Sequence, residues 1–220
     1  MSKLKCSIMV IDDHPIIHDG LKTLLATESD MEISSTASSA DEALEKLSNI
    51  NVDIAIVDLS LGGTDGTYLI QQIRKLYPDL KILVYTMSEE KLFAERSATA
   101  GAHGYVMKTS PPNTLKKAIR TVFSGELYFT EDTINRIRKK SEGYTDAPRT
   151  LLDNLSNREM DIFKLIGEGL DTALISERLN ISRNTVDTHR INIKNKLELP
   201  NGKAVERLAY EVIQQGRMPN

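Results

Sequence analysis

Five polar residues that are far apart in the sequence combine the chemical groups that phosphoryl transfer needs. They are Asp12, Asp13, Asp58, Thr86 and Lys108. Carboxylates that converge repel one another unless a cation lies among them, and hard oxygen ligands favour Mg2+. A carboxylate can then act as a nucleophile and form an aspartyl phosphate, while an ammonium and a hydroxyl group bind the phosphoryl oxygens. Together these residues predict a magnesium-dependent phosphoryl site with Asp58 as the nucleophile.

Each of these residues ends or directly follows a short apolar run, and the runs alternate with segments of helical periodicity. The runs predicted to be strands are residues 6–11, 32–35, 53–59, 81–86 and 104–107. They lack strict polar–apolar alternation, which favours a parallel sheet covered by helices on both faces. We therefore expect a five-stranded, doubly wound α/β domain of the flavodoxin type, with the polar residues gathered at the carboxyl ends of its strands.

Taken singly, an aspartate after a strand is usually a turn or helix-capping residue, so the complete set carries the prediction. The set also matches a family. Residues 5–124 closely resemble the receiver domains of two-component response regulators, through "VIDDHP", "IVDLSLGGTDG", "LVYT" and "GYVMK". The resemblance implies that a sensor histidine kinase phosphorylates Asp58. It also implies that Asp12, Asp13, Asp58 and the backbone carbonyl of Ser60 hold Mg2+.

The same resemblance makes Thr86 and Tyr105 a switch pair, in which phosphorylation draws Thr86 toward the phosphoryl group and lets Tyr105 turn inward. Three positions depart from the family pattern, at Leu61-Gly62, Thr109 and His18. None of them removes a catalytic group, so they bear on loop geometry alone.

Two histidines of this segment have the spacing of metal ligands on a helix, because His14 and His18 lie four residues apart. Pro15 stands between them. This favours the simpler interpretation, in which His14 is a helix-start residue and His18 an exposed one.

The last part of the chain has helical patterns only. Residues 172–179 and 183–197 are separated by a short turn, which is the arrangement of a helix-turn-helix. Its second helix would enter the major groove of DNA. The outer face of that helix offers groups for base edges and phosphates; the predicted DNA-binding residues are Arg183, Asn184, Asp187, Thr188, Arg190, Ile191 and Lys194. An ordinary helical bundle with a solvated face is the alternative.

A second resemblance favours DNA binding. Residues 155–215 resemble the LuxR-type, four-helix domain of the NarL/FixJ subfamily, through "LSNRE", "GLDTALISERLNIS", "NTVDTHRINIKNKL" and "AVERLAY". It implies a transcription factor that binds double-stranded DNA at a two-fold operator. It also favours a homodimer when phosphorylated, with a dimer surface on the closing helix at Val205, Leu208, Ala209 and Val212. The alternative is that this whole apolar side is core.

The expected domains are a receiver at 1–125, a linker at 126–154 and a DNA-binding domain at 155–220. Residues 1–130 hold 13 basic and 17 acidic side chains, whereas residues 155–220 hold 10 and 9. This difference agrees with different partners for the two parts. A single cysteine, Cys6, and an N-terminus without a cleavage site favour the cytoplasm.

Two other functions are weighed against this one. A phosphatase with an aspartyl-phosphate intermediate would need a second aspartate two residues after Asp58, where this chain has Ser60. The chain is therefore not expected to be an enzyme, beyond its own phosphorylation and dephosphorylation. A DNA-binding protein with a phosphate-blind receiver usually lacks an acid, the acceptor or the lysine, whereas all of them are present here.

Overall fold

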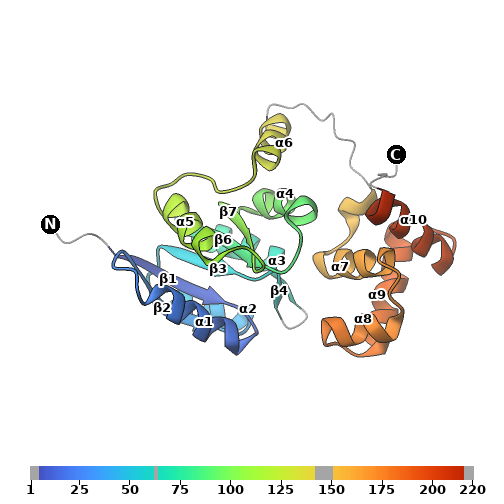
Figure 1. The fold of residues 1–220 in the computed structure, drawn as a ribbon, viewed down its shortest axis with the longest axis horizontal. Helices are drawn as coiled ribbons and strands as arrows, with labels where there is room; N and C mark the ends of the chain where they lie inside the picture. The colour runs from blue at the N-terminus through green and yellow to red at the C-terminus, as the bar shows by residue number, and fades with distance from the viewer. Residues whose placement is uncertain (1–4, 62–63, 142–150, 216–220) are drawn as a thin grey trace. The chain divides into compact units, whose positions relative to one another are not determined.

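The structure is a computed structural model that describes residues 5–61, 64–141 and 151–215 (Figure 1). The chain divides into two compact units, residues 1–144 and 145–220. Gly62 and Gly63, and residues 142–150 of the expected linker, lie outside the described residues. No helix in the described ranges has both the length and the apolar character that crossing a bilayer requires.

The first unit is built on a parallel sheet of five strands in the order β2-β1-β3-β6-β7. These strands are β1 (Cys6–Ile11), β2 (Met31–Ala37), β3 (Ile54–Val57), β6 (Lys81–Thr86) and β7 (Gly104–Met107). This strand order is that of flavodoxin-type sheets, which confirms the predicted fold class. The third strand is shorter than predicted, because it ends at Val57 and leaves Asp58 in the loop beyond it.

Helices follow the strands in turn and cover the sheet: α1 (Pro15–Leu25), α2 (Ala40–Leu47), α3 (Gly66–Leu76), α4 (Glu90–Ala100) and α5 (Pro112–Phe123). Helices α1 and α5 share one apolar core with the sheet, in which Ile8, Ile56 and Leu115 are buried. Helices α2, α3 and α4 contact one another in sequence order. Because both faces are covered, β1, β3, β6 and β7 are largely buried, as their apolar runs require, whereas the edge strand β2 is only partly buried.

After α5 the chain continues along the outer edge of the sheet. The Tyr105 N–H donates to the Tyr128 carbonyl at 2.8 Å, and the Tyr128 N–H donates to the His103 carbonyl at 2.9 Å. Helix α6 (Glu131–Ser141) follows and packs on α4. Its start is joined to α4 by the Thr130 N–H, which donates to Glu90 Oε1 at 2.9 Å. Part of the segment expected to be a linker is therefore packed on the first unit.

The second unit is helical, as predicted. It contains a short 3-10 turn (Leu151–Asn154) and helices α7 (Asn157–Gly167), α8 (Thr172–Leu179), α9 (Arg183–Lys196) and α10 (Gly202–Gln215). A capping box begins α7, because the Ser156 side chain accepts from the Glu159 N–H and the Glu159 side chain accepts from the Ser156 N–H. Helix α7 packs on α9 and α10, and α8 packs on α9.

Candidate functional site

The backbone at the carboxyl ends of the strands brings the predicted phosphoryl-site residues together. The Asp58 N–H donates to the Ile11 carbonyl at 3.0 Å, which holds the end of β3 beside the end of β1. The Lys108 N–H donates to the Thr86 carbonyl at 2.7 Å, which joins the ends of β7 and β6 in the same way. The side chains at these ends therefore converge at one edge of the sheet.

At the centre of this edge, one ammonium group bridges two carboxylates. Lys108 Nζ lies 2.6 Å from Asp12 Oδ2 and 2.6 Å from Asp58 Oδ2. All three side chains are buried, with exposures of 7% for Lys108, 2% for Asp12 and 4% for Asp58. Ion pairs this deep are costly to desolvate, so their presence points to function more than to stability.

The charges and the burial of this cluster raise the pKa of both Asp58 and Lys108. Burial raises the pKa of Asp58, and the attraction of Lys108 offsets that effect only in part. Burial alone would lower the pKa of Lys108, but the charges of Asp58 and Asp12 raise it above its usual value. An ionised Asp58 is therefore held at a cost in free energy, which suits a nucleophile.

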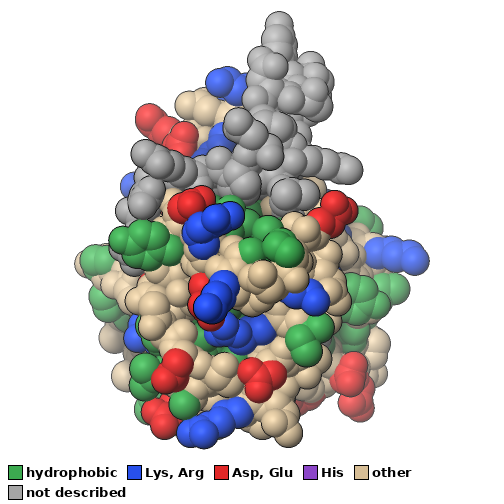
Figure 2. Space-filling model, turned by 90° about the vertical axis from the view of Figure 1, so that its right-hand side faces the viewer, with side chains coloured by type: hydrophobic (Ala, Val, Ile, Leu, Met, Phe, Trp, Pro, Cys, Tyr) green, Lys and Arg blue, Asp and Glu red, His purple; other side chains and the backbone are tan. Residues whose placement is uncertain are grey.

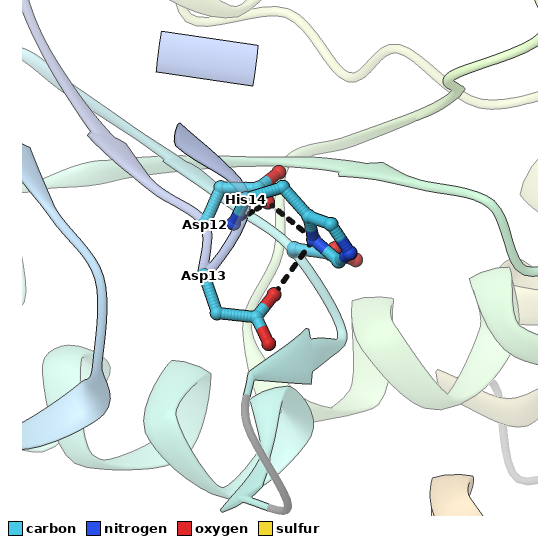
Figure 3. Close-up of side chains that lie close together, drawn as sticks. Asp12, Asp13 and His14 are labelled. Atoms are coloured by element: carbon cyan, nitrogen blue, oxygen red, sulfur yellow. Dashed lines mark hydrogen bonds and ion pairs between the residues drawn. The ribbon is translucent and has the colours of Figure 1, made fainter. Parts of the chain in front are cut away.

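Asp13 and His14 are the more exposed members of the cluster, and Figure 3 shows the His14 ring beside Asp12 and Asp13. Asp13 is 29% exposed, and its Oδ1 lies 2.8 Å from His14 Nδ1. Ligand atoms of Asp12, Asp13, His14 and Asp58 all lie within 4.8 Å of one another. Three carboxylates face one ammonium group here, and this excess of hard oxygen donors fits a divalent cation such as Mg2+.

The structure agrees with the prediction for His14 and contradicts the one for His18. His14 is the N-cap residue of α1, which agrees with a helix-start role, but it forms no side-chain capping bond and lies against the acids instead. His18 was expected to be exposed, and it is 8% exposed and therefore buried. The helical spacing of the two residues is thus unrelated to any shared ligand.

The loop after Asp58 contains one position, Gly66, whose importance for the site was not predicted from the sequence. The Ser60 N–H donates to Asp58 Oδ1 at 3.3 Å, and strands β4 (Ser60–Leu61) and β5 (Thr64–Asp65) form a small hairpin. Gly66 closes it so tightly that a Cβ atom there would collide with the Asp58 carbonyl oxygen and lie 2.6 Å from Leu59 Cα. The dipeptide Asp65-Gly66 is a turn signal, and it is the feature of the sequence that could have indicated this close approach.

The residues predicted to be a switch pair, Thr86 and Tyr105, are linked through Ser88, and Thr86 contacts Asp58 directly. The Thr86 side chain forms a hydrogen bond to Asp58 and accepts from the Ser88 N–H at 3.3 Å. The Tyr105 hydroxyl donates to the Ser88 carbonyl at 2.9 Å, and the residue is 1% exposed. Tyr105 therefore already has the inward position that was expected to follow phosphorylation, and Ser88 links it to Thr86.

In the second unit, the predicted recognition helix is α9. Its start is capped by the Ser182 side chain, which accepts from the Thr185 N–H. The turn before it contains Asn180 in the left-handed region (φ 50°). Val186 and Ile193 are buried against the domain, which turns the opposite face of α9 outward. Figure 2 shows the side of the molecule that lies on the right in Figure 1, where lysine and arginine side chains lie among acidic and apolar ones.

The side chains of the predicted DNA-binding residues differ in their exposure to solvent. Arg183, Asn184, Asp187, Thr188 and Ile191 are exposed, whereas Arg190 and Lys194 are half-buried.

Two of them are engaged within the domain. Arg190 forms an ion pair with Glu206 of α10 at 2.6 Å. Asp187 accepts from the Thr172 hydroxyl at 3.2 Å, at the start of α8. Among the described residues, no ion pair involves Lys194. The charge of Lys194 is therefore more available to a phosphate than that of Arg190.

The residues predicted to form a dimer surface on α10 are mostly core. Val205, Ala209 and Val212 are 2%, 0% and 7% exposed. Gly167 of α7 lies so close to the Ala209 carbonyl that a Cβ atom would be 2.5 Å from it. The prediction for these three side chains is corrected, because they are used within their own domain. Leu208 is half-buried.

The comparisons with known proteins agree with the two units. Residues 8–120 match the model of the response regulator receiver domain, and residues 153–209 match that of the LuxR family of bacterial regulatory proteins. The chain is 34% identical over 200 residues to the oxygen regulatory protein NreC of Staphylococcus epidermidis, covering 87% of this chain and 91% of that protein.

Two solved structures are similar. A LuxR-family two-component response regulator from Aurantimonas has a TM-score of 0.56 and 31% identity, covering 63% of this chain and 99% of that one. RcsB from Salmonella enterica, bound to promoter rprA in the presence of a phosphomimetic beryllofluoride, has a TM-score of 0.57 and 25% identity, covering 92% and 97%.

Proposed function

The chain belongs to the two-component response regulators that carry a LuxR-type DNA-binding domain, and we propose that phosphorylation of Asp58 controls its binding to DNA. The observation that carries this proposal is the position of Asp58, buried and within 2.6 Å of Lys108 among the other acids. Proteins of this family are transcription regulators and not classical enzymes. The only covalent chemistry that we propose is therefore the gain and loss of one phosphoryl group.

In the proposed transfer, a sensor histidine kinase supplies the phosphoryl group from a phosphohistidine. A carboxylate oxygen of Asp58 forms a bond to phosphorus while the bond from phosphorus to the imidazole nitrogen breaks, and the electron pair returns to that nitrogen. Lys108 neutralises charge on the phosphoryl oxygens. Asp12, Asp13, Asp58 and the Ser60 carbonyl would hold Mg2+, which supplies charge neutralisation when bound.

The response would pass through the residues that contact Asp58. The Thr86 hydroxyl forms a hydrogen bond to Asp58 in this structure. A phosphoryl group on Asp58 would offer the Thr86 hydroxyl an additional acceptor. Any displacement of Thr86 also acts on Ser88, which holds the Tyr105 hydroxyl. Phosphorylation would in this way shift an equilibrium between two arrangements of the segment from Thr86 to Ser88.

The output would be binding of α9 in the major groove of a two-fold operator, by a homodimer of phosphorylated chains acting in the cytoplasm. In one similar structure, two RcsB dimers are bound to two parallel DNAs. Thr188 and Ile191 are exposed and are assigned to the bases, and Lys194 to a phosphate. Because three apolar residues of α10 are buried, a dimer contact on this helix would have to use exposed side chains such as Tyr210, which is 53% exposed.

The direct test is intact mass after incubation with acetyl phosphate and Mg2+. The wild-type chain should gain one phosphoryl group and Asp58→Asn none. Asp19→Asn, at an exposed position of α1, is the matched control and should behave as wild type. Phosphorylation of Asp58→Asn at the wild-type rate would contradict the assignment.

A further inference from the structure

His14 occupies an N-cap position without acting as a cap. Such positions are usually Ser, Thr, Asp or Asn, whose side chains accept from the first turn of the helix. His14 makes no such bond, although Pro15 follows it and starts α1. Instead its own N–H donates to Asp12 Oδ1 at 3.0 Å. This bond bends the chain back, so the ring lies against the two carboxylates that precede it (Figure 3).

The ring presents a nitrogen to the acids. His14 Nδ1 lies 2.8 Å from Asp13 Oδ1 and 3.1 Å from Asp12 Oδ1. One ligand atom from each of Asp12, Asp13, His14 and Asp58 lies within 4.8 Å of the others. Opposite ligands of an octahedral ion with bonds of about 2.1 Å are about 4.2 Å apart. The four donors therefore need to move by only a small amount to share one ion.

The exposures place His14 on the side from which an ion arrives. The His14 side chain is 62% exposed and that of Asp13 is 29% exposed, whereas Asp12 is 2% exposed. Lys108 closes the opposite, buried side of the cluster through its ion pairs with Asp12 and Asp58. An ion that reaches the carboxylates from solvent meets the imidazole beside them.

We propose that His14 Nδ1 is a direct ligand of the divalent cation at this site and shifts its preference from Mg2+ toward first-row transition ions. The inference rests on the proposed function, because it assumes that the acids hold a cation. Oxygen ligands alone suit Mg2+, whereas imidazole nitrogen strengthens binding of the transition ions. The regulator would then load with an ion such as Mn2+ at concentrations where an oxygen-only site prefers Mg2+.

The test uses the full chain with Mn2+ as the probe, at about pH 8, because side chains must be deprotonated to bind a metal ion. Pulsed electron paramagnetic resonance of the Mn2+-loaded protein should show coupling to one imidazole 14N nucleus. This coupling should disappear in His14→Ala while Mn2+ remains bound to the acids. Calorimetry should show that His14→Ala weakens Mn2+ binding by at least about tenfold, which is the lower end of the loss caused by removing even an outer-shell partner of a metal ligand. Mg2+ binding should change much less.

Two further variants distinguish a failure of this inference from a failure of the proposed function. His14→Glu replaces nitrogen with a hard oxygen and should shift the preference back toward Mg2+. Asp13→Asn should weaken the binding of both ions. If neither ion binds in a way that depends on Asp13, the proposed function itself fails at its metal site. If both ions bind but the Mn2+ spectrum has no 14N coupling, His14 is only a hydrogen-bonding partner of the acids, and the inference is wrong.

Discussion

The two units carry their functional residues in opposite ways. In the first unit, Asp12, Asp58 and Lys108 are buried, and each is already bound to another member of the site. In the second unit, Thr188 and Ile191 are exposed, and the DNA bases that we propose as their partners lie outside the chain. The first site is thus assembled by folding, whereas the proposed DNA-binding surface of the second unit would be completed only by DNA. Variants of the first should therefore change folding and chemistry together, and variants of the second should change binding alone.

The largest effect on folding is expected from Lys108→Met. It leaves the buried carboxylates of Asp12 and Asp58 without their ammonium group, so the free energy of unfolding should fall by about 3 kcal/mol. Urea unfolding monitored by circular dichroism measures it. Millimolar Mg2+ should restore part of the loss, because a cation can replace the missing charge. A fully stable variant without Mg2+ would mean that the buried site is not held by this ion pair.

Gly66→Ala should cause the next largest loss of stability. Its Cβ would collide with the Asp58 carbonyl oxygen, so we expect a loss of about 2 kcal/mol in unfolding free energy. The rate of phosphorylation should fall with it. Gly20→Ala is the control, because a Cβ at that position in α1 meets nothing within 4 Å. It should stabilise the protein by about 0.5–1 kcal/mol. Equal effects of the two substitutions would contradict the close approach at Gly66.

Two buried acids should respond to removal of their charge with opposite signs. Burial raises the pKa of Glu159, but hydrogen bonds from Lys196 and Ser156 outweigh it, and the pKa is lowered. The stabilisation by Glu159 is therefore present above its unfolded pKa of about 4.3 and is lost as the pH falls through the folded value. The pKa of Asp58 is raised, so its stabilisation is present below its unfolded pKa and is lost as the pH rises.

At neutral pH, Glu159→Gln should lower the melting temperature of the second unit, at a cost of about 1–2 kcal/mol. Asp58→Asn should leave the first unit equally or more stable. Amide hydrogen exchange resolves the two units in the intact chain. If Asp58→Asn destabilises its unit as much as Glu159→Gln does, Asp58 is a structural ion-pair residue and the contrast between the two sites fails.

The smallest effect concerns the surface of α9 and involves no loss of stability. Lys194→Ala should reduce the slope of log affinity against log salt by about one unit. Arg190→Ala should reduce it by less, because Glu206 already neutralises that charge at 2.6 Å. Thr188→Ala should instead change the preference at one base pair by about 1–3 kcal/mol. An unchanged slope for Lys194→Ala would remove its assignment to a phosphate.

The same contrast between the units determines how much of each could be predicted from the sequence. Strand ends in a parallel sheet converge by topology, so the positions of Asp12, Asp58, Thr86 and Lys108 followed from the order of the runs. The small hairpin and Gly66 did not follow, because a close backbone approach has no periodic signal. The N-cap geometry that brings His14 to the acids depends on one hydrogen bond, to Asp12.

In the second unit, the helices and their buried faces were predictable from periodicity. The partners of individual surface residues were not. The apolar stripe on α10 did not indicate whether Val205 and Ala209 contact another chain or the core of their own domain. In the structure both residues are buried where α10 packs on α7, so they belong to the core. In the same way, the composition of α9 gave no sign that Arg190 is paired with Glu206 of the next helix.

Chemistry at Asp58 is proposed to control DNA binding by the second unit. The most direct measurement is the affinity of the full chain for one operator, untreated and with beryllofluoride and Mg2+, in the wild type and in Asp58→Asn. We expect tighter binding by the treated wild type, and no response from Asp58→Asn. Equal affinity of treated and untreated wild type, or an equal response from Asp58→Asn, would contradict this control.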